Sequence, residues 1–233
     1  MTTQLRLSLI FAAALALLAD GAVSTCQAVP FEITKLYIEY NQSANDLGFH
    51  VSLDGEDWKR MAITSPDHRK IFNVSGKGGY MQLGMTELFF EGAEPTLDEF
   101  PLDDLLALFP EGDYEFKGKT VDNEEISGIA TLSHAVPNGP ANAVATFTAP
   151  DSLVISWDAV TTHPVGFPDR PISIVGYQVL VDPFDVIVPA SVTSVTVSPE
   201  FAASLGSGDH PFEVLAIDAS GNQSITEGTV TVP

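Results

Sequence analysis

Apolar and polar residues alternate along most of the chain, which is the pattern of half-buried strands rather than of helices. In the C-terminal half the alternation is clearest in Ser152–Asp158, Ile174–Val181 and Phe212–Asp218. The last of these stretches runs into the turn-rich Asp218–Asn222. This combination predicts a central strand that enters a tight loop.

The N-terminal half shows the same alternation in Phe31–Tyr40 and in Leu47–Leu53, with turn-forming residues between them. Asp54-Gly55 predicts a hairpin turn, because these two residues favour the backbone of a two-residue loop. The glycine-rich stretch 76–84 predicts a flexible loop. Only Leu97–Phe109 has helical spacing, with a stripe of leucines that we expect to be buried.

The three C-terminal stretches, with Trp157 early and Ala216–Asp218 late, resemble a fibronectin type III domain. The resemblance covers residues 140–233 and implies a β-sandwich that contacts protein or glycan. One position departs from that family's pattern, because His210 stands where its members carry the tyrosine of the tyrosine corner. The corner is therefore either made by an imidazole or absent. Tyr114 holds the equivalent place in the N-terminal half, which resembles no named family.

Two stretches 96 residues apart share glycine, aspartate, phenylalanine and a final aspartate, namely Gly112–Asp122 and Gly208–Asp218. Each leads through polar residues to a second apolar stretch, so each predicts a terminal hairpin. Duplication of one domain and a hairpin common to all sandwiches both account for the match. We expect an all-β fold of two immunoglobulin- or fibronectin III-like β-sandwich domains, residues 29–137 and 138–233, the first with one inserted short helix.

The first residues predict export. Arg6 precedes the apolar run Leu7–Leu18, which has the length of a signal-peptide core and is short for a membrane span. We expect a signal peptide over residues 1–28 and a periplasmic or extracellular protein. A buried N-terminal helix and a lipid-modified Cys26 are the alternatives. Cleavage after Ala28 removes the sole cysteine.

The net charge of −21 excludes several classes of partner. Nucleic acid and anionic membrane surfaces are poor partners, because binding to either depends on basic side chains that neutralise phosphates. After the leader no apolar stretch approaches the length of a transmembrane helix. The sequence leaves the oligomeric state open.

The sequence carries no recognised catalytic motif. It lacks the Gly-x-Ser-x-Gly, His-Glu-x-x-His and phosphate-loop patterns, and its five histidines are scattered singly. The acidic loops Asn45-Asp46, Asp54–Asp57 and Asp218–Asn222 are explained more readily by side-chain turns than by calcium. We therefore expect no catalytic residue, no cofactor and no metal site.

The connection Ala159–Ser173 is long and proline-rich, and it carries His163, Phe167 and Arg170 as the candidate partner-binding residues. Either Phe167 and Arg170 pack on the first domain, or they are exposed anchors for a partner, since aromatic residues and arginine dominate binding hot spots. Taken together, the sequence favours an exported non-enzymatic binding or structural protein of the cell surface or periplasm that contacts protein or glycan. The alternative is a polysaccharide-acting enzyme with a carboxylate site in the N-terminal domain.

Overall fold

A computed structural model describes residues 28–233. The expected signal peptide and Cys26 fall in residues 1–27, outside the described residues. Residues 28–137 form the elements β1 (Val29–Pro30), β2 (Ile33–Asn41), β3 (Asp46–Thr64), β4 (Lys70–Ser75), α1 (Gly79–Leu83), β5 (Met85–Glu91), α2 (Leu102–Leu108), β6 (Gly112–Thr120) and β7 (Glu125–Leu132). Residues 138–233 form β8 (Val144–Thr148), β9 (Ser152–Ser156), β10 (Ile174–Val181), β11 (Phe184–Pro189), β12 (Ser194–Val197), α3 (Pro199–Ser204), β13 (Gly208–Asp218) and β14 (Gln223–Val232).

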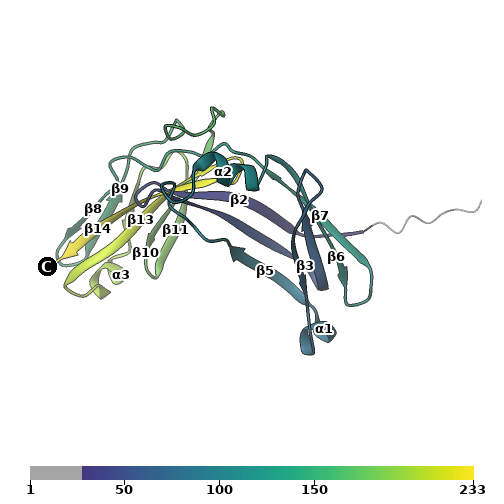
Figure 1. The fold of residues 1–233 in the computed structure, drawn as a ribbon. Helices are drawn as coiled ribbons and strands as arrows, with labels where there is room; N and C mark the ends of the chain where they lie inside the picture. The colour runs from purple at the N-terminus through teal and green to yellow at the C-terminus, as the bar shows by residue number, and fades with distance from the viewer. Residues whose placement is uncertain (1–27) are drawn as a thin grey trace, which may run out of the picture.

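Strands dominate these elements, which confirms the all-β class. One sheet runs through both halves in the order β1-β7-β6-β3-β2-β14-β13-β10-β11, and β4 and β5 also pair with β3. The halves join where Gln223–Ile225 of β14 lies parallel to Glu39–Asn41 of β2. Figure 1 shows this sheet as an arch, with α2 on the convex side. The division at residue 137 stays a prediction, and the sheet is continuous across it.

Two groups of buried apolar side chains form the interior. The first lies among β2, β3, β6 and β7 and is closed on one side by Leu105 and Leu106 of α2. The second lies between the small sheet β12-β9-β8 and strands β10, β13 and β14, with Trp157 against Tyr177 at 5.3 Å between ring centroids. Alternating strands bury every second side chain, so each half supplies its own core.

The hairpin turn expected at Asp54-Gly55 is wrong, because β3 continues through both residues. The register of its pairing with β5 shifts between Asp54 and Trp58. Before the shift β3 also pairs with β2, and after it with β4 and β6. A Cβ atom on Gly55 would lie 2.9 Å from the Phe31 ring. The glycine therefore permits close packing at this bend rather than a turn.

The helix expected over Leu97–Phe109 is present but shorter, since α2 begins after Pro101 and ends at Leu108. The loop expected over residues 76–84 contains the short helix α1, and α3 was not predicted. Ser198 begins α3, and its hydroxyl accepts a hydrogen bond from the Phe201 amide. Serine before a helix and proline at its first position are typical of a helix start. The helix itself is too short to show helical spacing in the sequence.

The hairpins β6–β7 and β13–β14, whose sequences match at a few positions, also begin with similar local structure. Both begin at a glycine with positive φ, 130° at Gly112 and 132° at Gly208. The Tyr114 hydroxyl donates to the carbonyl four residues earlier at 3.0 Å, and the His210 ring Nε2 donates to the carbonyl four residues earlier at 2.7 Å. The corner is thus made by an imidazole in the second half.

Candidate functional site

The connection Ala159–Ser173 packs against the N-terminal half. Phe167 is buried in the first core, and its ring lies 4.8 Å from the ring of Tyr40, measured between centroids. The Arg170 guanidinium donates two hydrogen bonds to the Glu111 carboxylate, at 3.2 and 2.7 Å. The sequence left two interpretations open, packing on the first domain or exposed anchors for a partner, and these contacts fit the packing. Phe167 is therefore not an exposed anchor.

His163 and Arg170 remain at the surface. The His163 Nε2 lies 3.5 Å from the exposed Asp169 carboxylate, and binding of a partner by His163 and Arg170 stays a prediction. The hydrogen bond from Arg170 and the one from the His134 amide lower the pKa of Glu111 to about 2, although partial burial opposes them. The Arg170–Glu111 pair thus stays ionised over the whole physiological range.

The turn Asp218–Asn222 lies at the junction of the two halves. Asn222 is fully buried, and its amide oxygen accepts from the Ile38 N–H at 2.8 Å. Its amide nitrogen donates to the carbonyls of Ser133 and Ala135 at 2.7 and 3.0 Å. This side chain, in the turn between β13 and β14, therefore bonds both β2 and the connection after β7. Asn222-Gln-Ser224 has the Asn-x-Ser pattern of a glycosylation acceptor, and burial makes Asn222 inaccessible to glycosylation in the folded protein.

An apolar pocket of about 620 Å³ opens between α2 and the strands β3, β4 and β5. Apart from Glu94, every lining residue is apolar or glycine. The lining residues are Phe49, Val51, Ile63, Ile71, Phe72, Phe90, Gly92, Ala93, Glu94, Pro95, Phe100, Leu105, Leu108 and Phe109. Apolar side chains that remain in contact with water at a concave surface are typical of a binding site.

The chain around this pocket is strongly acidic. Residues 78–116 supply most of the lining, and they contain ten acidic side chains and neither lysine nor arginine. Asp98, Glu99, Asp103 and Asp104, which lie within and just before α2, are all exposed. These four residues neighbour the lining residues Phe100 and Leu105 in the sequence, and we refer to them as the acidic rim of the pocket.

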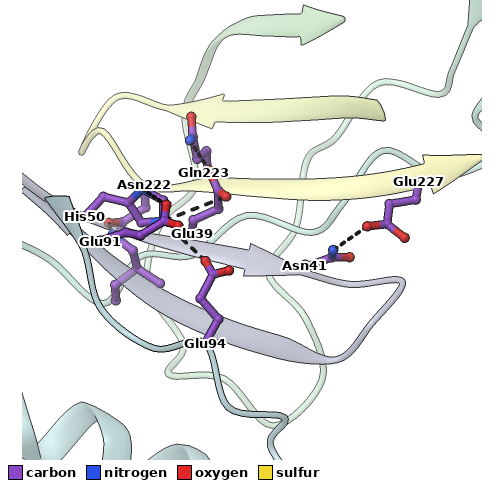
Figure 2. Close-up of polar contacts among 9 residues, drawn as sticks. Glu39, Asn41, His50, Glu91, Glu94, Asn222, Gln223 and Glu227 are labelled. Carbon is purple, nitrogen blue, oxygen red and sulfur yellow. Dashed lines mark hydrogen bonds and ion pairs between the residues drawn. The ribbon is translucent and has the colours of Figure 1, made fainter. Parts of the chain in front are cut away.

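A polar cluster, the His50 cluster, gathers Glu39, His50, Glu91 and Glu94 around the imidazole. Its histidine lies on the face of the sheet opposite the pocket, while Glu94 also lines the pocket. Side chains alternate along β3, so Phe49 lines the apolar pocket while His50 points to the other face. The His50 Nε2 lies 3.4 Å from Glu94 Oε1 and 3.8 Å from Glu39 Oε1, and its Nδ1 lies 3.7 Å from Glu91 Oε2. Figure 2 shows the three carboxylates gathered around the imidazole.

Neighbouring side chains hold the cluster in place. The Tyr37 ring stacks on His50 with 5.0 Å between centroids, and burial, together with nearby Glu39 and Glu91, raises the pKa of Tyr37 to about 12. Burial also raises the pKa of Glu39, and this is opposed by His50 and by the hydrogen bond that Gln223 donates to Glu39. His50 itself is 4% exposed.

The cluster borders a hollow of about 510 Å³ on this face, which residues of both halves line. Tyr37 and Phe89, which contact His50, belong to the lining together with Gln178 of β10 and Ile187 of β11. The continuous sheet is what brings these residues together, because β2 and β10 are in different halves.

Neither the apolar pocket nor the His50 cluster was predicted from the sequence. Glu39 and His50 come from the consecutive strands β2 and β3, whereas Glu91 and Glu94 come from β5 and the segment after it, which pairing with β3 brings alongside. Two of the acidic stretches weighed above as calcium sites have structural roles. Asp54 and Asp57 belong to β3, and Asp218 accepts from the Ser220 amide at 2.9 Å in a side-chain turn. In residues 28–233, none of the helices is long and apolar enough to cross a membrane.

No protein-family model matches the chain, and no curated protein matches it significantly. Among solved structures, the chain is similar to the FN1–FN3 domains of chicken CNTN1, at 12% identity over 88% of this chain and 70% of that chain, with a TM-score of 0.34. It is also similar to the spore cortex lytic enzyme SleM of Clostridium perfringens, at 17% identity over 41% of this chain. That match spans only 28% of SleM, with a TM-score of 0.34. Neither likeness carries an argument about function.

Proposed function

We propose that this chain is an exported, non-enzymatic binding protein of the cell surface or periplasm, and that it binds a protein partner through the apolar pocket beside α2. The second half is proposed as a fibronectin type III-like domain. The arrangement of β8, β9 and β12 opposite β10, β13 and β14, with Trp157 in the core between them, supports that assignment. The observation that supports this function is the apolar pocket. Its lining offers almost no polar group to bind a glycan, so we propose a protein partner instead.

The partner proposed is an amphipathic, basic segment of a protein. Apolar side chains spaced along one face of a helix enter grooves of this kind. Lysine or arginine on the flanks of that helix would meet the acidic rim formed by Asp98, Glu99, Asp103 and Asp104. Complementary charge accelerates association and discriminates against acidic partners.

The test uses two short amphipathic peptides with the same leucine face, one carrying lysine and the other glutamate on its polar face. We expect the lysine peptide to bind and its affinity to fall as NaCl rises from about 50 to about 500 mM, because salt screens the rim charges. The glutamate peptide should not bind. Equal binding of both peptides would contradict the role of the rim.

A variant that fills the pocket locates the binding site. Ala93 lines the pocket and is exposed, so Ala93→Trp should obstruct the pocket without removing a core side chain. We expect it to weaken binding of the lysine peptide at least tenfold, or about 1.4 kcal/mol. Ala203→Trp, at an exposed position of α3, is the matched control. Unchanged affinity in Ala93→Trp would refute the pocket as the site.

The second candidate remains a polysaccharide-acting enzyme. It is favoured by one observation, that carboxylate oxygens of Glu39 and Glu94 lie within 4.8 Å of each other and burial raises the pKa of Glu39. Glycoside hydrolysis uses two carboxyl groups, of which the general acid has a raised pKa. Release of reducing ends from a polysaccharide panel, abolished by Glu39→Gln and Glu94→Gln, would establish this candidate and overturn the non-enzymatic proposal.

Export is tested separately from binding. N-terminal sequencing of the protein isolated from its native host should begin at Val29. A first residue of Met1 or a lipid-modified Cys26 would contradict cleavage after Ala28.

A further inference from the structure

We propose that Glu39, His50 and Glu94 form a binding site for one divalent transition-metal ion of the zinc class. His50 points to the face of the sheet opposite the apolar pocket, whereas Glu94 also lines that pocket. The inference does not rest on the proposed function. Each of the three residues offers one ligand atom, and these atoms lie within 4.8 Å of one another.

The distances fit a shared ion better than they fit direct hydrogen bonds. The separations of 3.4 Å and 3.8 Å from His50 Nε2 to the two carboxylates exceed the 2.7–3.2 Å or so of a good hydrogen bond. Two ligands bound at about 2.0–2.2 Å to a tetrahedral ion lie roughly 3.3–3.6 Å apart. The two carboxylates therefore lie at close to this spacing from the imidazole nitrogen, and the three ligand atoms lie within 4.8 Å of one another.

The chemistry of the three ligands selects the class of ion. An imidazole nitrogen suits zinc, copper, iron and nickel, whereas calcium and magnesium prefer oxygen ligands throughout. The imidazole is held almost entirely out of water, while three carboxylates surround it. A divalent cation would offset their mutual repulsion.

The surroundings supply the outer contacts that metal ligands need. Glu91 Oε2 lies 3.7 Å from His50 Nδ1, on the side where an outer carboxylate commonly orients a metal-binding imidazole. Gln223 donates to the Glu39 oxygen that does not face His50. Gly48 makes room for Glu94, because a Cβ atom there would lie 2.6 Å from Glu94 Oε1.

The test is titration of the metal-free protein with Zn²⁺ alone by isothermal calorimetry, with Ca²⁺ and Mg²⁺ in parallel. We expect one Zn²⁺ per chain, no comparable binding of the other two ions, and visible absorption bands when Co²⁺ replaces Zn²⁺. His50→Gln and Glu94→Gln should each weaken Zn²⁺ binding at least 100-fold. Gln223→Leu, which removes only an outer contact, should weaken it about 10-fold.

Two matched controls separate the site from the general acidity of the protein. His68→Gln changes an exposed histidine, and Glu87→Gln removes an exposed carboxylate from the same strand as Glu91. Both should bind Zn²⁺ as the wild type does. If His50→Gln fails to fold, the more exposed Glu94→Gln decides the matter. Absence of stoichiometric Zn²⁺ binding, or equal affinity in Glu94→Gln and Glu87→Gln, would overturn the proposal.

Discussion

Replacement of Asn222 by alanine should destabilise the whole protein, because this one side chain satisfies three buried main-chain groups. The variant would remove the hydrogen bonds to the Ile38 N–H and to the carbonyls of Ser133 and Ala135, and only the Ala135 carbonyl would keep another contact, at 3.4 Å from the Ser220 hydroxyl. Each buried group left unsatisfied costs about 1–3 kcal/mol. We expect the free energy of unfolding to fall by about 3–6 kcal/mol, a large share of the 5–15 kcal/mol or so that a folded protein has.

Asn222→Asp refines the test, because aspartate has the same shape. It preserves the acceptor for Ile38 but sets a carboxylate oxygen against two carbonyl oxygens. The ionised form is disfavoured there, so its folded pKa should rise above the value of about 4 in the unfolded chain. The destabilisation should therefore be full above the folded pKa and shrink as the pH falls toward 4.

Urea denaturation followed by tryptophan fluorescence measures both effects, since Trp58 reports on one half and Trp157 on the other. Asn73→Ala is the matched control, because Asn73 is exposed on β4, and it should change stability by less than about 0.5 kcal/mol. A loss below about 1 kcal/mol in Asn222→Ala would refute the view that Asn222 holds the junction together.

Three further predictions concern the second core, two buried tyrosines and the Arg170–Glu111 pair. Trp157→Ala should cost about 3–5 kcal/mol in urea denaturation, because its ring lies in the second core against Tyr177. Burial raises the pKa of Tyr37 and of Tyr114 to about 12, so absorbance at 295 nm should show both still protonated at pH 11. The pKa of Glu111 is lowered to about 2 by Arg170, so stability from this pair is present above pH 4.5 and is lost as the pH falls toward 2. Melting temperatures of Arg170→Ala and wild type should therefore differ at pH 7 and converge near pH 2.

The spacing of apolar residues along the sequence predicted individual strands and one helix, but not how the strands pair. Alternation located β9, β10 and β13, and the leucine stripe located α2. The pairing of β14 with β2 joins Gln223 to Glu39 and has no local signal, so the continuous sheet was not predicted. At Asp54-Gly55 the sequence favours a turn, but β3 continues because strands pair with it on both edges.

The His50 cluster depends on strand register and on one glycine, neither of which marks a site in the sequence. The turn between Asn41 and Asp46 fixes the register of β2 against β3, which sets His50 opposite Tyr37 and Gly48 opposite Glu39. Glu39 and His50 thus become diagonal neighbours on one face. Gly48 then leaves a space beside Glu39, and Glu94 occupies it after β5 has passed along β3. A side chain at position 48 would fill that space, so the cluster depends on a residue that has no ligand chemistry of its own.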